Sequence, residues 1–153
     1  MEVHTILWPT DLSKNSLKAA THVSSLADKY QAKIILLYVG VDMASHLRAY
    51  GDPSQTQVEH FQEWELTQAR KQLESVCAKE LQACPNIELK LVTGDAATEI
   101  IKTIKEQKAD MVVLTAHGRG SEELDQKSVD FGSVARKVLA NSPVPVQLVN
   151  PQA

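Results

Sequence analysis

Two segments in the second half of this 153-residue sequence carry residue types that could bind an anion. The segment Thr115-Ala116-His117-Gly118-Arg119-Gly120 follows an apolar run. Gly132-Ser133-Val134 opens a helix-like pattern, with thirteen residues between Gly118 and Gly132. Glycines let backbone N–H groups approach a ligand, and a helix N-terminus attracts negative charge. Arg119 and the Ser133 hydroxyl could donate to phosphate oxygens. The pattern is typical of a phosphate site, but it also fits an ordinary turn followed by a serine-capped helix.

A catalytic role for His117 is the less favoured interpretation of the same segment. A histidine beside a phosphate could act as an acid or base. The sequence around it has no carboxylate pair or Ser-His-Asp order, and no HxxxH metal pattern occurs in the chain. It also contains neither GxxxxGK[ST] nor GxGxxG, the common nucleotide loops. The sequence therefore predicts binding more strongly than catalysis.

A second polar cluster follows the first apolar run of the chain. Pro9-Thr10-Asp11 ends the β-rich segment 3–9, and Val39-Gly40 ends the apolar run 34–39. Asp11 could contact a ligand, or it could be a turn residue that bonds its own backbone. Both interpretations stay open at this point.

Alternating strand-like and helix-like segments are expected to bring these clusters together. Apolar runs at 3–9, 34–39, 87–92, 111–114 and 144–149 read as strands, and helical periodicity covers 13–30, 58–81, 96–107 and a segment that starts at 132. This order predicts one doubly wound α/β domain over residues 1–153, with a parallel sheet and helices on both faces. Ligands of such folds bind beyond the carboxyl ends of the strands.

Three of these segments carry more specific expectations. Residues 13–30 are predicted to form one helix of about five turns that Ser13 caps, with an apolar stripe that ends at Tyr30. The helix 58–81 is expected to bury Trp64 in its apolar stripe together with Phe61. The strand 144–149 is expected at a sheet edge, because Pro145 removes a ladder donor.

The composition of the chain argues against nucleic-acid-binding and membrane-spanning proteins. The formal net charge of -3 gives no basic face for nucleic acid, and no apolar run approaches the roughly 20 residues that a membrane span needs. The first residues lack the pattern of a secretion signal, so we expect a cytosolic protein. The two cysteines, Cys77 and Cys84, are expected to be reduced structural thiols.

Along nearly its whole length the sequence resembles the universal stress protein family. The resemblance is carried by four segments in order: Ile6 to Ser13 with its Pro-Thr-Asp turn, Leu36 to Val39, Gly94-Asp95-Ala96 with Glu99-Ile100-Ile101, and Ala109 to Arg119 followed by Gly132-Ser133-Val134-Ala135 and Pro143 to Val146. Each segment is weak evidence alone, and the ordered set is specific.

The resemblance implies a strand order of 3-2-1-4-5 and a homodimer in which the last strands, 144–149 here, pair across a two-fold axis. Some members bind ATP, with which Mg²⁺ would be expected, through Gly-x2-Gly-x9-Gly-[Ser/Thr]. Here Gly118 matches the second glycine, Thr115 replaces the first, and the spacer has thirteen residues. The positions implied for an adenine nucleotide are Pro9, Thr10, Asp11, Val39, Leu114, Thr115, His117, Gly118, Arg119, Gly132, Ser133 and Val134.

Three hypotheses for function follow. The first is a cytosolic stress-response regulator that binds ATP or another adenine nucleotide as a ligand. The second is a protein of the same fold that acts through an unidentified protein partner without nucleotide, which Thr115 and the long spacer favour. The third is a slow ATP hydrolase, and the absence of an acid–base set and of a Mg²⁺-binding carboxylate pattern counts against it.

Overall fold

Five strands form one parallel sheet in the order β3-β2-β1-β4-β5. The computed structural model describes residues 2–40, 51, 54–81, 86–116 and 132–150. Their elements are β1 (Thr5–Thr10), α1 (Lys14–Leu17), α2 (Ala20–Tyr30), β2 (Lys33–Gly40), α4 (Gln55–Glu80), β3 (Ile87–Thr93), α5 (Ala96–Gln107), β4 (Met111–Thr115), α6 (Ser133–Asn141) and β5 (Val146–Val149). The predicted doubly wound architecture and its strand order are confirmed.

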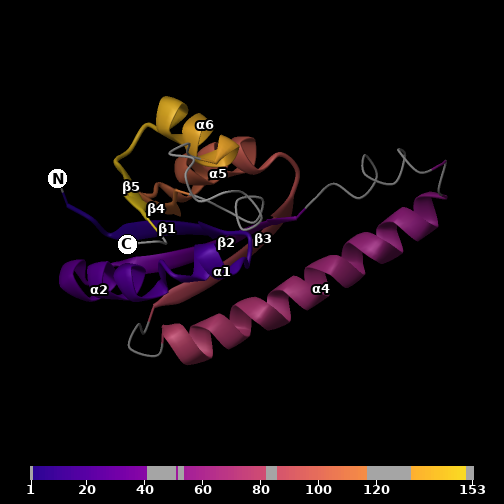
Figure 1. Cartoon of the computed structure of the whole chain (residues 1–153), viewed down its shortest axis with the longest axis horizontal. Helices are drawn as coiled ribbons and strands as arrows, with labels where there is room; N and C mark the ends of the chain where they lie inside the picture. Colours follow the sequence, from indigo (N-terminus) through magenta and orange to yellow (C-terminus); the bar gives the residue numbers. More distant parts are fainter. Residues whose placement is uncertain (1, 41–50, 52–53, 82–85, 117–131, 151–153) are drawn as a thin grey trace.

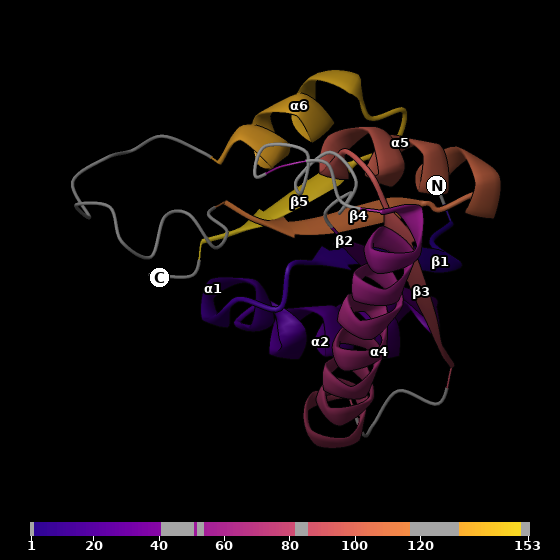
Figure 2. The same ribbon diagram turned by 90° about the vertical axis from the view of Figure 1, so that its right-hand side faces the viewer.

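Helices cover both faces of the sheet, as Figures 1 and 2 show, with α2 and α4 on one side and α5 and α6 on the other. The reason lies in the alternation of side chains along each strand. In β1, Trp8 packs into the α2 and α4 layer, whereas Leu7 packs into the α5 and α6 layer. Both residues are fully buried, which explains why β1 and β2 read as continuous apolar runs rather than alternating ones.

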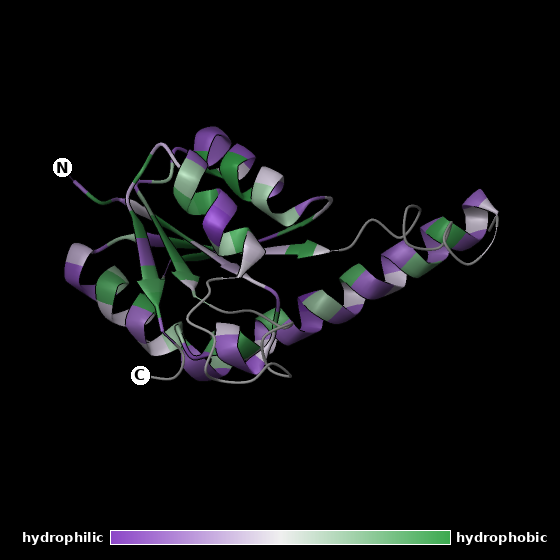
Figure 3. Ribbon diagram, turned by 45° about the horizontal axis from the view of Figure 1, so that its top comes forward, coloured by the Kyte–Doolittle hydropathy of each residue, from purple (hydrophilic) through white to green (hydrophobic). Residues whose placement is uncertain are grey.

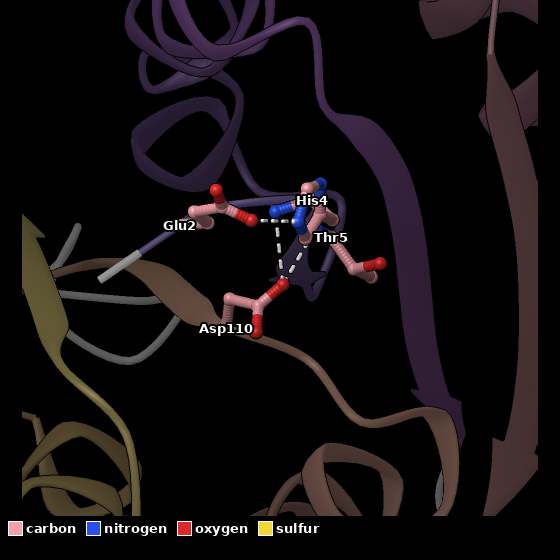
Figure 4. Close-up of polar contacts among 4 residues, drawn as sticks. All are labelled: Glu2, His4, Thr5 and Asp110. Atoms are coloured by element: carbon pink, nitrogen blue, oxygen red, sulfur yellow. Dashed lines mark hydrogen bonds and ion pairs between the residues drawn. The ribbon is translucent and has the colours of Figure 1, made fainter.

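Asp110 fixes the amino-terminal end of β1 against the start of β4 (Figure 4). Its Oδ2 accepts hydrogen bonds from the backbone N–H groups of His4, at 2.9 Å, and Thr5, at 3.0 Å. The Nε2 of His4 also lies 3.0 Å from Glu2 Oε2. This cluster lies at the end of the strands opposite the carboxyl edge, so we assign it a structural role.

The single helix predicted for residues 13–30 is wrong in one respect, because the chain forms two helices. Ser13 caps the first as expected, since its side chain accepts from Ser16 N. At Lys18 the backbone N–H bonds to Asn15 O and Ser16 O, which tightens the turn and ends α1. The change of direction lets Ala19 and Ala20 pack against the sheet, while Tyr30 at the far end is exposed.

The predicted burial of Trp64 is also wrong, because its side chain is 60% exposed. The predicted apolar positions Ala69, Leu73 and Val76 do face the sheet, together with Leu66, and Trp64 does not share that face. The amino-terminal half of α4 also extends past the sheet (Figure 1), so no layer lies under it. Phe61 is 47% exposed for the same reason.

The terminal strand is an edge strand, as predicted, but it begins two residues later than expected, at Val146. Residues before it form a local turn, in which Ser142 Oγ donates to Val144 O at 2.8 Å and Val144 N donates back to that hydroxyl at 3.2 Å. The first strand differs as well, since β1 continues through Pro9 to Thr10. Proline is tolerated there because the pairing of β1 with β4 spans Ile6 and Leu7 and ends before it.

We expect Gly94→Ala to lower the free energy of unfolding by about 1–3 kcal/mol. Gly94 has φ +139°, and an added Cβ would lie 3.2 Å from Glu99 Oε1. Chemical denaturation measures the effect. Gly51→Ala is the matched control, since Gly51 has φ +136° with no atom within 4 Å of the added Cβ. Equal losses in both variants would show that backbone strain alone, without the Glu99 contact, accounts for the cost.

Candidate functional site

The turn between β1 and α1 is held by a network of buried hydroxyls. Thr10 Oγ1 lies 2.6 Å from Ser16 Oγ and accepts from Leu12 N at 3.0 Å. Ser13 Oγ accepts from Ser16 N at 3.1 Å. Thr10, Ser13 and Ser16 are all buried, and Leu12 takes a left-handed conformation with φ 65°. The network therefore fixes the path of the backbone at the carboxyl end of the central strand.

Asp11 occupies the middle of this turn and is half-buried. Its Oδ1 accepts a hydrogen bond from Ser13 N at 2.9 Å, which is the local backbone contact of an Asx turn. The turn interpretation of Asp11 is thus confirmed. The same contact holds the carboxylate at the sheet edge, where a ligand would lie.

A carboxylate of α4 that the sequence interpretation missed lies against the adjacent end of β2. Tyr38 pairs with Thr10 across the sheet, and its hydroxyl donates to Glu65 Oε1 on α4. The other oxygen, Glu65 Oε2, is buried without a hydrogen-bond partner among the described residues. An added Cβ on Gly40 would lie 2.7 Å from this oxygen, so the glycine makes room for it. The sequence offers Glu65 only as one of several acidic residues of this helix, close to its predicted buried stripe.

The carboxyl end of β4 leads to the N-terminus of α6. Ala116 N donates to Val149 O at 3.0 Å, and Ala116 O accepts from Gly132 N at 2.8 Å. This short path brings the start of α6 to the end of β4, beside Leu114 and Thr115. Leu114 is buried and Thr115 half-buried.

Gly132 is the N-cap of α6 and has φ -60° and ψ 154°. The N-cap residues Ser13, Ser54 and Asp95 have similar extended angles, and each accepts a backbone N–H of its helix through its side chain. Gly132 has no side chain to do so, and the first turn of α6 contains no acidic residue. Within the described part of the chain no side chain caps this positive end, where an external acceptor could bind.

Asp95 caps α5 at the same edge of the sheet, after β3. The pKa of its carboxyl lies below the usual value because the Thr98 hydroxyl and then the Thr98 backbone N–H donate to it. A lowered pKa means that this cap is fully formed at neutral pH and is lost only as the pH falls through the lowered value. Asp95 therefore serves the helix rather than a ligand.

The structure brings together most of the predicted positions that it describes. Pro9, Thr10 and Asp11 lie at the end of β1, Val39 at the end of β2, Leu114 and Thr115 at the end of β4, and Gly132, Ser133 and Val134 at the start of α6. The predicted residues His117, Gly118 and Arg119 lie outside the described part of the chain. Ser16 was missed, although its spacing from Ser13 is that of a capped helix turn.

Comparison with known proteins decides the family. The model of the universal stress protein family matches residues 2–150. The chain belongs to the universal stress protein family. A universal stress protein from Methanocaldococcus jannaschii is 29% identical over 144 residues, which cover 94% of this chain and 80% of the relative.

Solved universal stress proteins share this fold. UspA from Lactobacillus plantarum matches 98% of this chain and 99% of its own, with a TM-score of 0.74 and 23% identity. A universal stress protein solved in complex with cAMP has a TM-score of 0.62 and 20% identity over 99% of both chains. The Archaeoglobus fulgidus protein in complex with dAMP has a TM-score of 0.65 and 15% identity over 98% of this chain and 100% of its own.

The described part of the chain has neither a membrane-spanning helix nor a cluster of metal-ligating side chains. None of its helices has the length and apolar character that crossing a bilayer requires. None of its His, Cys, Asp and Glu side chains form a group of three that could hold a metal ion.

Cys77 is a free cysteine, and burial raises the pKa of its thiol, with Glu74 adding to the effect. The Cys77 thiol is therefore protonated at neutral pH. Cys84, the other cysteine predicted to be a structural thiol, lies outside the described residues.

Proposed function

We propose that this universal stress protein is a cytosolic stress-response regulator that binds an adenine nucleotide, ATP in particular, at the carboxyl edge of its sheet. The ligand acts as a signal and not as a substrate. The observation that carries the proposal is the uncapped N-terminus of α6 at Gly132, which meets the ends of β1, β2 and β4 at one edge. Two relatives of the same fold were solved with the adenine nucleotides cAMP and dAMP, which supports this ligand class.

We place the phosphates and the nucleoside of the nucleotide in two separate subsites. Gly132, Ser133 and Val134 offer the phosphates the backbone N–H groups and positive end of α6, and Ser133 is exposed at its first position. The opposite subsite, for the nucleoside, consists of the Pro9-Thr10-Asp11 turn and Val39. Any Mg²⁺ would arrive with the phosphates, since a metal of this type usually keeps phosphate and water ligands.

Slow hydrolysis of ATP is the least supported outcome. Phosphoryl transfer needs a residue that positions the attacking water and a metal held on the transferred phosphate. The carboxylates at the described edge are already engaged, since Asp11 bonds Ser13 N, Asp95 caps α5 and Glu65 accepts from Tyr38. We therefore expect bound ATP to be recovered intact after prolonged incubation.

Mass spectrometry of the small molecules released from the purified, denatured protein, followed by calorimetric titration, tests the proposal. We expect an adenine nucleotide at near one per chain, or ATP binding in the titration when the ligand has been lost in purification. GTP is the control for base recognition. No binding of ATP, ADP or cAMP at millimolar concentration would refute the proposal.

A second function, binding of a protein partner without nucleotide, is favoured by one residue. Thr115 stands where nucleotide-binding members have the first glycine of their motif, and its Cβ occupies space that a close ligand needs. In that case titration gives no heat with nucleotide, and capture of partners by the immobilised chain becomes the informative experiment.

We further propose that the chain forms a homodimer through segment 144–149, and expect Val146→Asp to convert the dimer into a monomer. The outer edge of β5 leaves backbone groups available for a second copy, and a buried carboxylate at that edge costs several kcal/mol. Sedimentation velocity measures the change. Val146 also packs into its own chain, against the α5 and α6 layer.

Val92→Asp is therefore the matched control, because Val92 is half-buried against the same layer on β3, at the other edge. This variant should lose similar stability and stay dimeric. A Val146→Asp protein that sediments as the wild type does would contradict strand pairing at β5.

A further inference from the structure

Helix α4 carries a second stripe of residues that its own fold does not use. Trp64 and Phe61 are among the most exposed large apolar side chains of the described chain, at 60% and 47%. Figure 1 shows that this half of the helix extends past the sheet, and Figure 3 shows hydrophobic residues along it. Exposed aromatic residues that adjoin on one helix are typical of an interaction surface.

Phe61 and Trp64 belong to one exposed side of the helix, whose other positions are polar or basic. Gln57, Phe61, Trp64, Gln68, Lys71 and Ser75 alternate steps of four and three residues along one side of the helix. We call these six residues the outer seam. Five of them are exposed and Gln68 is half-buried, whereas the separate stripe through Leu66, Ala69, Leu73 and Val76 packs into the core. The outer seam spans about 27 Å at 1.5 Å per residue.

We propose that the outer seam pairs with the outer seam of a second copy of this chain, in antiparallel orientation. Pairing centred between Trp64 and Gln68 places Trp64 opposite Gln68 of the other copy, and Phe61 opposite Lys71. Every contact then occurs twice, as a two-fold axis requires. A parallel pair would instead set Lys71 against Lys71.

Charge complementarity supports this occupant. Aromatic rings lie in the amino-terminal half of the seam and its cation in the carboxyl-terminal half, so each Lys71 meets the face of a Phe61. Beside the seam, His60 packs edge-on against Phe61, with ring centroids 6.1 Å apart. Antiparallel pairing brings His60 close to Glu74 of the second copy, whose carboxylate can accept a hydrogen bond from the imidazole. The six seam residues include no acidic side chain.

The outer seam shares no residue with the proposed nucleotide site, and it lies far from the proposed β5 interface. Helix α4 covers β2 and β3, and β5 lies at the other edge of the sheet. The two contacts together would link dimers into tetramers or longer chains. A seam of this length is small, so we expect a dissociation constant on the order of 100 μM.

Sedimentation equilibrium from about 5 μM to about 1 mM tests the proposal on the full chain. We expect the average mass to keep rising with concentration, and Trp64 fluorescence to shift to shorter wavelength as that ring becomes buried. Trp64→Ala should weaken the association at least tenfold. Tyr30→Ala is the matched control, because it removes an exposed aromatic ring from α2, at 41% exposure, and should have no effect.

Cysteine cross-linking tests the orientation. Thr67 lies beside the centre of the seam, next to its own counterpart in the antiparallel pair, and is exposed. In a Cys77→Ser, Cys84→Ser background, Thr67→Cys should form an intermolecular disulfide, whereas Arg70→Cys, at an exposed position beside the core-facing stripe and away from the outer seam, should not.

Three results would overturn the pairing: a constant mass up to 1 mM, association that Trp64→Ala leaves unchanged, or equal cross-linking of both cysteine variants. A constant mass together with recruitment of the chain to vesicles of anionic phospholipid would instead assign the seam to a lipid surface. Loss of nucleotide binding alone changes none of these readouts.

Discussion

Replacing Gly132 by aspartate is expected to weaken binding of ATP at least 30-fold while raising the free energy of unfolding by about 0.5 kcal/mol. The two effects have opposite signs because the aspartate carboxylate would cap the same backbone N–H groups of α6 that we propose for the phosphates. The cap stabilises the helix and takes these donors from the ligand. Gly132 already has the extended angles of a capping residue, φ -60° and ψ 154°. An aspartate there can accept the N–H groups of α6 as Asp95 accepts that of Thr98 in α5.

The same carboxylate would occupy the position proposed for a phosphate and repel it. Loss of one charge-assisted hydrogen bond costs about 1.5–3 kcal/mol, and each 1.4 kcal/mol is a tenfold change in affinity. Calorimetric titration and thermal unfolding measure the two effects on one preparation.

Gly132→Asn is the matched control, since asparagine caps a helix as well as aspartate does and carries no charge. We expect it to keep the gain in stability and to weaken ATP binding less than aspartate does. If both variants bind ATP with the affinity of the parent chain, the phosphates do not lie at α6.

Truncating Leu73 to alanine is expected to lower the free energy of unfolding by about 3–4 kcal/mol. The Leu73 side chain is fully buried between α4 and the sheet, so its removal leaves a cavity as well as losing apolar contact. A loss of this size is a large part of the stability of an ordinary domain. Urea denaturation followed by far-UV circular dichroism measures it.

Trp64→Ala is the control in the same helix. It removes a larger side chain, yet we expect a change within about 0.5 kcal/mol, because Trp64 is largely exposed in the single chain. Measurement at low micromolar concentration keeps any self-association out of the comparison. A loss near 3 kcal/mol for Trp64→Ala would mean that this ring is buried in the free chain.

The strands of the sheet could be predicted from the sequence because the apolar pattern of each strand is local and all the patterns agreed with one fold. Continuous apolar runs predicted buried strands at Ile34–Val39 and Met111–Leu114, and β2 and β4 lie in the interior of the sheet. Residues Ile87–Val92 begin with alternating apolar and polar side chains, a pattern typical of a strand near a sheet edge, and β3 is at the edge. The period of side chains along a strand depends only on neighbouring residues, so it can be read without knowing the fold.

Errors arose where a side chain's environment depends on a distant element. Trp64 has the residue type of a core position, but whether it is buried depends on how far α4 extends past the sheet. The break after Leu17 depends on a turn that no proline or glycine marks. Glu65 contacts Tyr38 across 27 residues of chain, and an isolated helix gives no sign of that contact.

In the candidate site, too, the features that depend on neighbouring residues could be predicted, and those that depend on the path of the backbone could not. The turn chemistry of Thr10 and Asp11 and the start of α6 at Gly132 could be predicted from residue types and spacing. The hydroxyl contact between Thr10 and Ser16 could not, because it requires the path that Leu12 takes at positive φ.

Titration of the isotope-labelled chain with ATP, followed through its backbone amide resonances, tests the central claim most directly. The account predicts saturable shifts, at near one ATP per chain, that are largest at Thr10 to Ser13, at Val39 and at Gly132 to Val134. Resonances of the Asp110 cluster at the opposite end of the strands should stay in place. Shifts confined to that opposite end, or no shifts at millimolar ATP, would contradict it.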